Sequence, residues 1–175
     1  MNKKSFKLIA SIGLITGAIF GMAGSFVTSP SLRSLAWGID GVGLIVASAL
    51  LTIHYFRKKE DITASGFLIF AAGQCLILAS SGSDLDANAF IFGAGTGLWA
   101  AALFVISFQK TFPFFIRFTG ALAAILFANV AVQIFTGYAV NALSKPLPFF
   151  AYPVFVITIF GWTWTLRKET FSSQG

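Results

Sequence analysis

Six long apolar runs divide this sequence, and no other feature constrains the fold as strongly. Each run holds about 18 to 24 residues, and a helix needs about 20 apolar residues to cross the hydrocarbon core of a bilayer. The runs cover residues 8–28, 35–56, 62–80, 89–109, 114–137 and 149–166. We therefore predict an all-α integral membrane protein in which residues 1–175 form one domain, a bundle of six transmembrane helices. Pro153 is expected to bend or interrupt the last helix.

The composition agrees with this class. The chain of 175 residues is 57% hydrophobic and 10% charged, whereas average proteins are about 25% charged. A soluble domain of this size cannot bury so much apolar surface, so the lipid bilayer is the expected partner. A net charge of +6 is also found in nucleic-acid-binding proteins, so the placement of the charges decides its meaning.

The basic residues lie almost entirely on one side of the predicted bundle. That side, with both termini and the second and fourth loops, holds Lys3, Lys4, Lys7, Arg57, Lys58, Lys59, Lys110, Arg117, Arg167 and Lys168. The opposite side holds Arg33 and Lys145. Because basic loops stay in the cytoplasm, we predict a multi-pass protein of the bacterial inner (plasma) membrane with both termini cytoplasmic. The charge is a topology signal, and no nucleic-acid partner is expected.

The first apolar run carries a small residue at every fourth position. Gly13, Gly17 and Gly21 share one face of the predicted helix, as in a glycine zipper, and this face allows another helix to approach closely. That helix can belong to this chain, to a second copy in a homo-oligomer or to a partner membrane subunit. A basic start before an apolar run also describes a cleaved signal peptide, but the full spanning length favours a retained helix.

A weak internal repeat occurs at an offset of 54 residues. Residues 41–44 (GVGL) match residues 95–98 (GTGL), and Gly66 matches Gly120. One interpretation is a parallel repeat of two helices, as found in some transporters. The other is coincidence, because glycine is common in membrane helices.

Asp40 is the acidic residue that falls inside an apolar run, Leu35–Phe56. A carboxylate at the centre of a spanning helix costs about 2.5–3.5 kcal/mol, which makes it a candidate for function, here as a proton or cation site. The alternative is an ion pair with Arg33, seven residues earlier. His54, the single histidine, lies about 40° from Asp40 around the helix. We interpret His54 as an interfacial side chain with a solvated tip, and a proton path as its alternative role.

Three polar amides lie in the same half of the predicted bundle as Asp40. Gln74, Asn129 and Gln133 fall within roughly 12 Å of its outer edge at the helical rise per residue. Buried polar groups need partners, so we expect the three amides to line a shared polar pocket with Asp40. The alternative is that each amide forms its own interhelical hydrogen bond.

Two smaller predictions concern the ends of the runs. Trp162 and Trp164, near the inner end of the last run, are expected to be interfacial anchors. Asp86 or Asn88 is expected to cap the helix that starts at residue 89.

No chemical motif accompanies these features. One histidine and one cysteine, Cys75, do not make a haem-ligating pair, a redox pair or a zinc cluster. Walker, HExxH and catalytic-triad patterns are missing from the sequence. We therefore assign no catalytic residue, no metal ligand and no cofactor, and an enzyme acting on lipid ranks below the other functions.

These features favour a function inside the bilayer. The leading hypothesis is a small transporter-like or ligand-binding membrane protein with an outward-facing polar pocket around Asp40. The alternative is a non-catalytic accessory or scaffold subunit of a membrane complex, whose small-residue faces dock partner helices.

Overall fold

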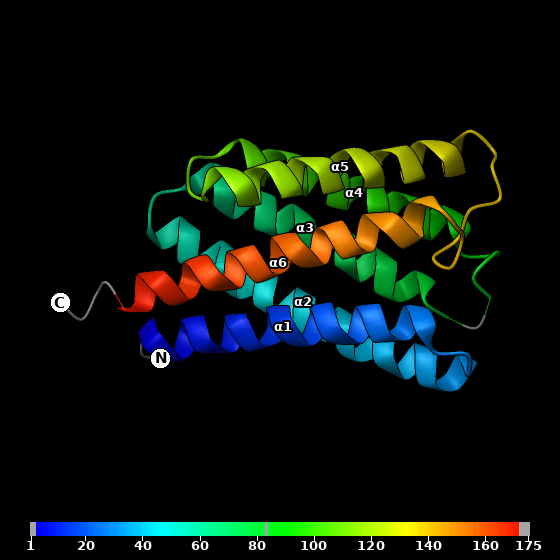
Figure 1. Cartoon of the computed structure of the whole chain (residues 1–175), viewed down its shortest axis with the longest axis horizontal. Helices are drawn as coiled ribbons and strands as arrows, with labels where there is room; N and C mark the ends of the chain where they lie inside the picture. The colour runs from blue at the N-terminus through cyan, green and yellow to red at the C-terminus, as the bar shows by residue number, and fades with distance from the viewer. Residues whose placement is uncertain (1–2, 83, 172–175) are drawn as a thin grey trace.

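Six α-helices form the protein in the computed structural model, which describes residues 3–82 and 84–171 (Figure 1). They are α1 (Lys3–Phe26), α2 (Pro30–Arg57), α3 (Asp61–Ser80), α4 (Ala89–Phe108), α5 (Phe114–Phe135) and α6 (Leu147–Phe171). Each is long and apolar enough to cross a membrane. Their bounds agree with the predicted runs to within five residues, which confirms the prediction of six helices.

The helices are arranged as a closed ring. Each helix contacts the helices before and after it in the sequence, and α6 returns to contact α1. The start of α1 and the end of α6 lie together (Figure 1), and we call this the terminal end. The opposite end, the loop end, carries the α1–α2, α3–α4 and α5–α6 connections. Ser83, between the predicted runs of residues 62–80 and 89–109, lies outside the described residues.

Glycines allow neighbouring helices in the ring to approach closely. A Cβ atom added to Gly13 of α1 would lie 2.7 Å from the carbonyl oxygen of Gly43 in α2. Cβ atoms added to Gly73 in α3 and Gly95 in α4 would each lie 3.0 Å from the other residue's carbonyl oxygen. At both contacts the backbones touch directly, which is the packing that small residues permit between membrane helices.

Aromatic rings fill the inside of the ring of helices. Phe70 stacks on Trp99 with 5.2 Å between the ring centroids, and Phe155 lies 4.8 Å from Trp99. Trp162 contacts both Phe70 and Phe67 and is 1% exposed. The prediction that Trp162 is an interfacial anchor is therefore wrong, because the wide interior of a six-helix ring needs large side chains to fill it.

Helix α6 runs through Pro153 without interruption. Proline has no backbone N–H, so the carbonyl group of Phe149 loses its usual helical donor at this point. The alternative of an interrupted helix is therefore wrong, and the alternative of a bend at Pro153 stays a prediction.

Charged side chains join three helices at the terminal end. The Glu169 carboxylate of α6 lies 3.2 Å from Lys7 Nζ of α1, 3.1 Å from His54 Nε2 of α2 and 3.0 Å from Lys58 Nζ. Burial lowers the pKa of Lys58, but the hydrogen bonds and negative charges of Glu169 and Glu60 outweigh it and raise this pKa above its ordinary value of 10.5. The ion pairs of Lys58 therefore stabilise the fold at neutral pH, and their contribution is lost only above that value.

We expect Glu169→Gln to lower the free energy of unfolding by about 1–2 kcal/mol, because three cationic or hydrogen-bonding partners lose a half-buried carboxylate. Denaturation of the purified protein in detergent measures this loss. Asp61→Asn is the matched control, since Asp61 is exposed at the same end and its carboxylate forms no ion pair with another described residue. Equal losses in the two variants would contradict a role for Glu169 in joining the helices.

Candidate functional site

A pocket of about 130 Å³ lies inside the ring towards the loop end. All six helices contribute side chains to its wall, and Ala142, Leu143 and Lys145 of the α5–α6 connection complete it. An apolar cavity of similar size, about 150 Å³, holds one benzene molecule. The pocket is therefore large enough for a small organic ligand.

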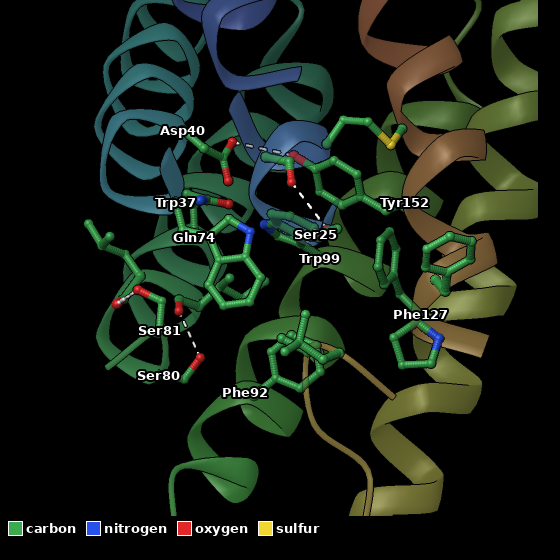
Figure 2. A pocket seen from close by; sticks show the side chains of 18 of the residues that line it. Ser25, Trp37, Asp40, Gln74, Ser80, Ser81, Phe92, Trp99, Phe127 and Tyr152 are labelled. Atoms are coloured by element: carbon green, nitrogen blue, oxygen red, sulfur yellow. Dashed lines mark hydrogen bonds between the residues drawn. The ribbon is translucent and has the colours of Figure 1, made fainter. Parts of the chain in front are cut away.

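Asp40 of α2 contributes a buried carboxyl group to this pocket. Its side chain is 4% exposed, and the Tyr152 hydroxyl of α6 donates a hydrogen bond of 3.4 Å to Asp40 Oδ1, as Figure 2 shows. The Gln74 side chain of α3 lies beside this carboxyl group, as Figure 2 shows. Arg33 instead donates to the carbonyl oxygens of residues 27 and 28, at 3.0 and 3.4 Å. The alternative ion pair between Asp40 and Arg33 is therefore not formed.

Gly21 of α1 makes the contact between Asp40 and Tyr152 sterically possible. A Cβ atom at this position would collide with the Tyr152 hydroxyl and would lie 3.0 Å from Asp40 Cγ. The last glycine of the predicted face thus serves the pocket, whereas Gly13 and Gly17 lie against α2.

Two buried polar atoms in the pocket wall have no hydrogen-bond partner among the described residues. They are Gln74 Oε1, an acceptor, and Trp99 Nε1, a donor. Two further such atoms, Ser48 Oγ and Tyr55 Oη, belong to residues outside the pocket. An unsatisfied buried group costs about 1–3 kcal/mol unless water or a ligand supplies the partner. The residues that line the pocket thus carry a carboxyl group, an unpartnered acceptor and an unpartnered donor.

The other candidate residues from the sequence lie elsewhere. Asn129 is exposed on the outside of α5, Gln133 is half-buried, and neither lines the pocket. Phe127 is the α5 residue that faces the pocket, and residues two and six positions later are rotated from it by about 200° and 240°. His54 lies at the terminal end beside Glu169. Of the five candidates, the structure brings together Asp40 and Gln74.

Tyr152 and Trp99 belong to the site although the sequence did not assign them to it. A signal for Tyr152 existed, because a tyrosine hydroxyl inside an apolar run needs a hydrogen-bond partner. Trp99 lies in the middle of the fourth run, and from the sequence this position is compatible with lining a cavity, with packing or with contact to lipid.

The α5–α6 connection is tied to the α3–α4 connection at the loop end. Asn141 Nδ2 donates a hydrogen bond of 2.7 Å to Asp86 Oδ1. Asn88 donates to the carbonyl oxygen of Asp84, and α4 begins without a side-chain cap. The prediction that Asp86 or Asn88 caps α4 is therefore wrong, because both side chains are used within and between the connections. This link holds the residues that complete the pocket.

The arrangement can bind a ligand through charge, hydrogen bonds and aromatic contact. Within the described part of the chain, no group of three or more histidine, cysteine or acidic side chains is placed to hold a metal ion. No protein-family model, curated protein or solved structure matches this chain.

Proposed function

We propose that this chain is a multi-pass membrane protein that binds a small ligand in the pocket around Asp40, as a transporter-like protein does. The observation that carries this proposal is the buried Asp40 carboxyl group in a pocket with two unpartnered polar atoms. Such groups are costly in an apolar interior, and a chain that needed packing alone would do better with apolar side chains. A ligand that pairs with them offsets this cost.

Release of the ligand towards the terminal end requires a conformational change. Trp99 and Phe127 line the pocket and also belong to the aromatic core beyond it. A transported solute would therefore have to separate these rings, whereas a ligand that is only bound would not. The proposal covers both cases, because both need an accessible pocket.

A second candidate function is that of an accessory or scaffold subunit. The exposed Asn129 amide on the outside of α5 supports it, since an amide facing hydrocarbon gains from a partner helix. Under this function the pocket would be inaccessible to solutes, and the outer face of α5 would be the functional surface.

The proposed orientation places the terminal end in the cytoplasm and the mouth of the pocket outside, in a bacterial inner membrane. Its support is the excess of basic residues at the terminal end. The two-helix repeat stays a prediction.

We expect reporter fusions after Gly175 and within residues 84–88 to report opposite sides of the membrane, because an odd number of spans separates an α3–α4 loop from the C-terminus. A cytoplasmic reporter should be active at Gly175 and a periplasmic one in the loop. The same side for both fusions would contradict the six-span topology.

Access to the pocket can be tested by cysteine labelling. In a Cys75→Ser background, Ser25→Cys and Ser81→Cys place thiols in the pocket wall. We expect a membrane-impermeant thiol reagent applied from outside to label both. Ser48→Cys is the matched control, because Ser48 is fully buried and does not line the pocket. If neither pocket cysteine is labelled while the protein is intact in the membrane, the proposal is overturned and the function of a scaffold subunit is favoured.

A further inference from the structure

We propose that the ligand of this pocket carries a small primary or secondary ammonium group with an oxygen acceptor nearby, the chemistry of a protonated amino alcohol. This inference rests on the proposed function and names its ligand class. Four independent properties of the pocket lead to it: its charge, its aromatic wall, its unpartnered atoms and its size.

The charge of the pocket favours a cation. Asp40 forms no ion pair with any described residue, so its carboxyl group has the hydrogen bond from Tyr152 but no cationic partner in direct contact. A cationic ligand would supply that partner in a site where water competes weakly.

The end of the ring at which the pocket lies also favours cations. Apart from Asp40, the loop end carries Asp84 and Asp86 against the basic residues Arg33 and Lys145. The terminal end carries ten basic and three acidic residues. Apart from Asp40, the loop end thus carries equal numbers of acidic and basic residues, whereas the terminal end is strongly basic, so a cation is repelled less at the loop end.

Aromatic rings form much of the wall and can hold an ammonium group. Trp37, Trp99, Tyr152 and Phe149 are among the lining residues, and the face of an aromatic ring attracts a cation within about 6 Å. The chain itself contains an example at the mouth, where the exposed Lys145 ammonium lies 4.9 Å from the centre of the Phe149 ring.

The unpartnered atoms define the hydrogen bonds that the ligand must make. Gln74 Oε1 needs a donor, and Figure 2 shows the Gln74 side chain beside the Asp40 carboxyl group. A primary or secondary ammonium group can donate to both residues, but a quaternary one cannot. Trp99 Nε1 needs an acceptor, which a hydroxyl or carbonyl oxygen of the ligand provides.

The size of the pocket limits the part of the ligand that enters it. A volume of about 130 Å³ holds a group about the size of benzene. The same ammonium group can come from a free amine or from the ethanolamine headgroup of a lipid.

The test uses the purified full chain and four small probes. Ethanolamine carries the ammonium and the hydroxyl group, choline lacks the N–H donors, ethylene glycol lacks the charge, and glycolate reverses it. We expect ethanolamine to raise the melting temperature and change the tryptophan fluorescence at saturating concentration. Choline should bind about tenfold more weakly, because Gln74 Oε1 stays unpartnered. Equal or tighter binding of ethylene glycol or glycolate would overturn the proposal.

Variants separate the proposed contacts. Gln74→Leu should abolish the preference for ethanolamine over choline, and Trp99→Phe should weaken ethanolamine about tenfold while keeping the ring. Asn129→Leu replaces an amide outside the pocket. It should change neither the preference for ethanolamine over choline nor the affinity for ethanolamine. An unchanged preference in Gln74→Leu would contradict the proposed hydrogen bond to Gln74. If Gln74→Leu fails to fold, unchanged ethanolamine binding by Trp99→Phe would contradict the proposed hydrogen bond from the indole.

The source of the ammonium group is tested in nanodiscs of phosphatidylethanolamine or phosphatidylcholine. Stabilisation by free ethanolamine supports a soluble amine, and stabilisation by the ethanolamine lipid alone supports a headgroup. The absence of both effects overturns the ligand class. If Ser25→Cys is still labelled from outside in that case, the pocket and the proposed function stand. If it is not labelled, both fail.

Discussion

Asp40→Asn is expected to weaken the binding of ethanolamine by about 100-fold while the six-helix ring stays folded. Asparagine has nearly the same shape as aspartate, and its side-chain oxygen can still accept the hydrogen bond from the Tyr152 hydroxyl. The substitution removes the negative charge that a cationic ligand would neutralise. It also removes the cost of burying a carboxylate, so the melting temperature of the ligand-free protein should be equal or higher.

Asp61→Asn is the matched control for this prediction, because it makes the same chemical change at an exposed position of the terminal end. It should leave ethanolamine binding unchanged. Equilibrium titration and thermal unfolding of both variants in detergent measure the two effects separately. An Asp40→Asn protein that melts far below the wild type would indicate a structural role for the carboxyl group, and wild-type affinity would exclude Asp40 from the binding site.

Gly17→Leu is expected to destabilise the contact between α1 and α2 by about 3 kcal/mol or more. A Cβ atom at Gly17 would lie 2.5 Å from Leu44 Cγ and 3.2 Å from Asp40 Oδ1, so a leucine has no room unless the two helices separate. Because the same contact positions Asp40, we also expect the variant to bind ethanolamine weakly. Thermal unfolding in detergent measures the loss.

Gly38→Leu is the control for Gly17→Leu. Gly38 lies in α2, and a Cβ atom there would meet no atom within 4 Å, so leucine should be tolerated. In this structure Gly17 faces α2 of the same chain, and we therefore expect the apparent mass in detergent to stay the same in both variants. A change of mass in Gly17→Leu alone would indicate that the glycines contact a second copy.

The sequence by itself determined the helices. The length of an apolar run decides whether it can cross a membrane, and this property depends only on consecutive residues. Helices α3, α4 and α5 accordingly begin within one residue of the predicted positions. The special status of Asp40 was also visible, because a carboxyl group in an apolar run is costly in any fold.

Tertiary structure decided which polar side chains meet. Asn129 and Gln133 shared the depth of Asp40 in the predicted bundle, but depth does not determine the direction in which a side chain points. The rotation of α5 in the ring turns Phe127 inwards and Asn129 outwards. That rotation depends on which neighbours α5 packs against, and the sequence of α5 alone does not specify them.

The closure of the ring decided the composition of the site. Tyr152 and Asp40 are 112 residues apart in sequence, and they meet because α6 packs against α1 and Gly21 leaves room between them. Trp99 joins the site because its ring stacks on Phe70 inside the ring of helices. Contacts of this kind depend on the packing of several helices at once, so they follow from the assembled ring and not from the periodicity of any single run.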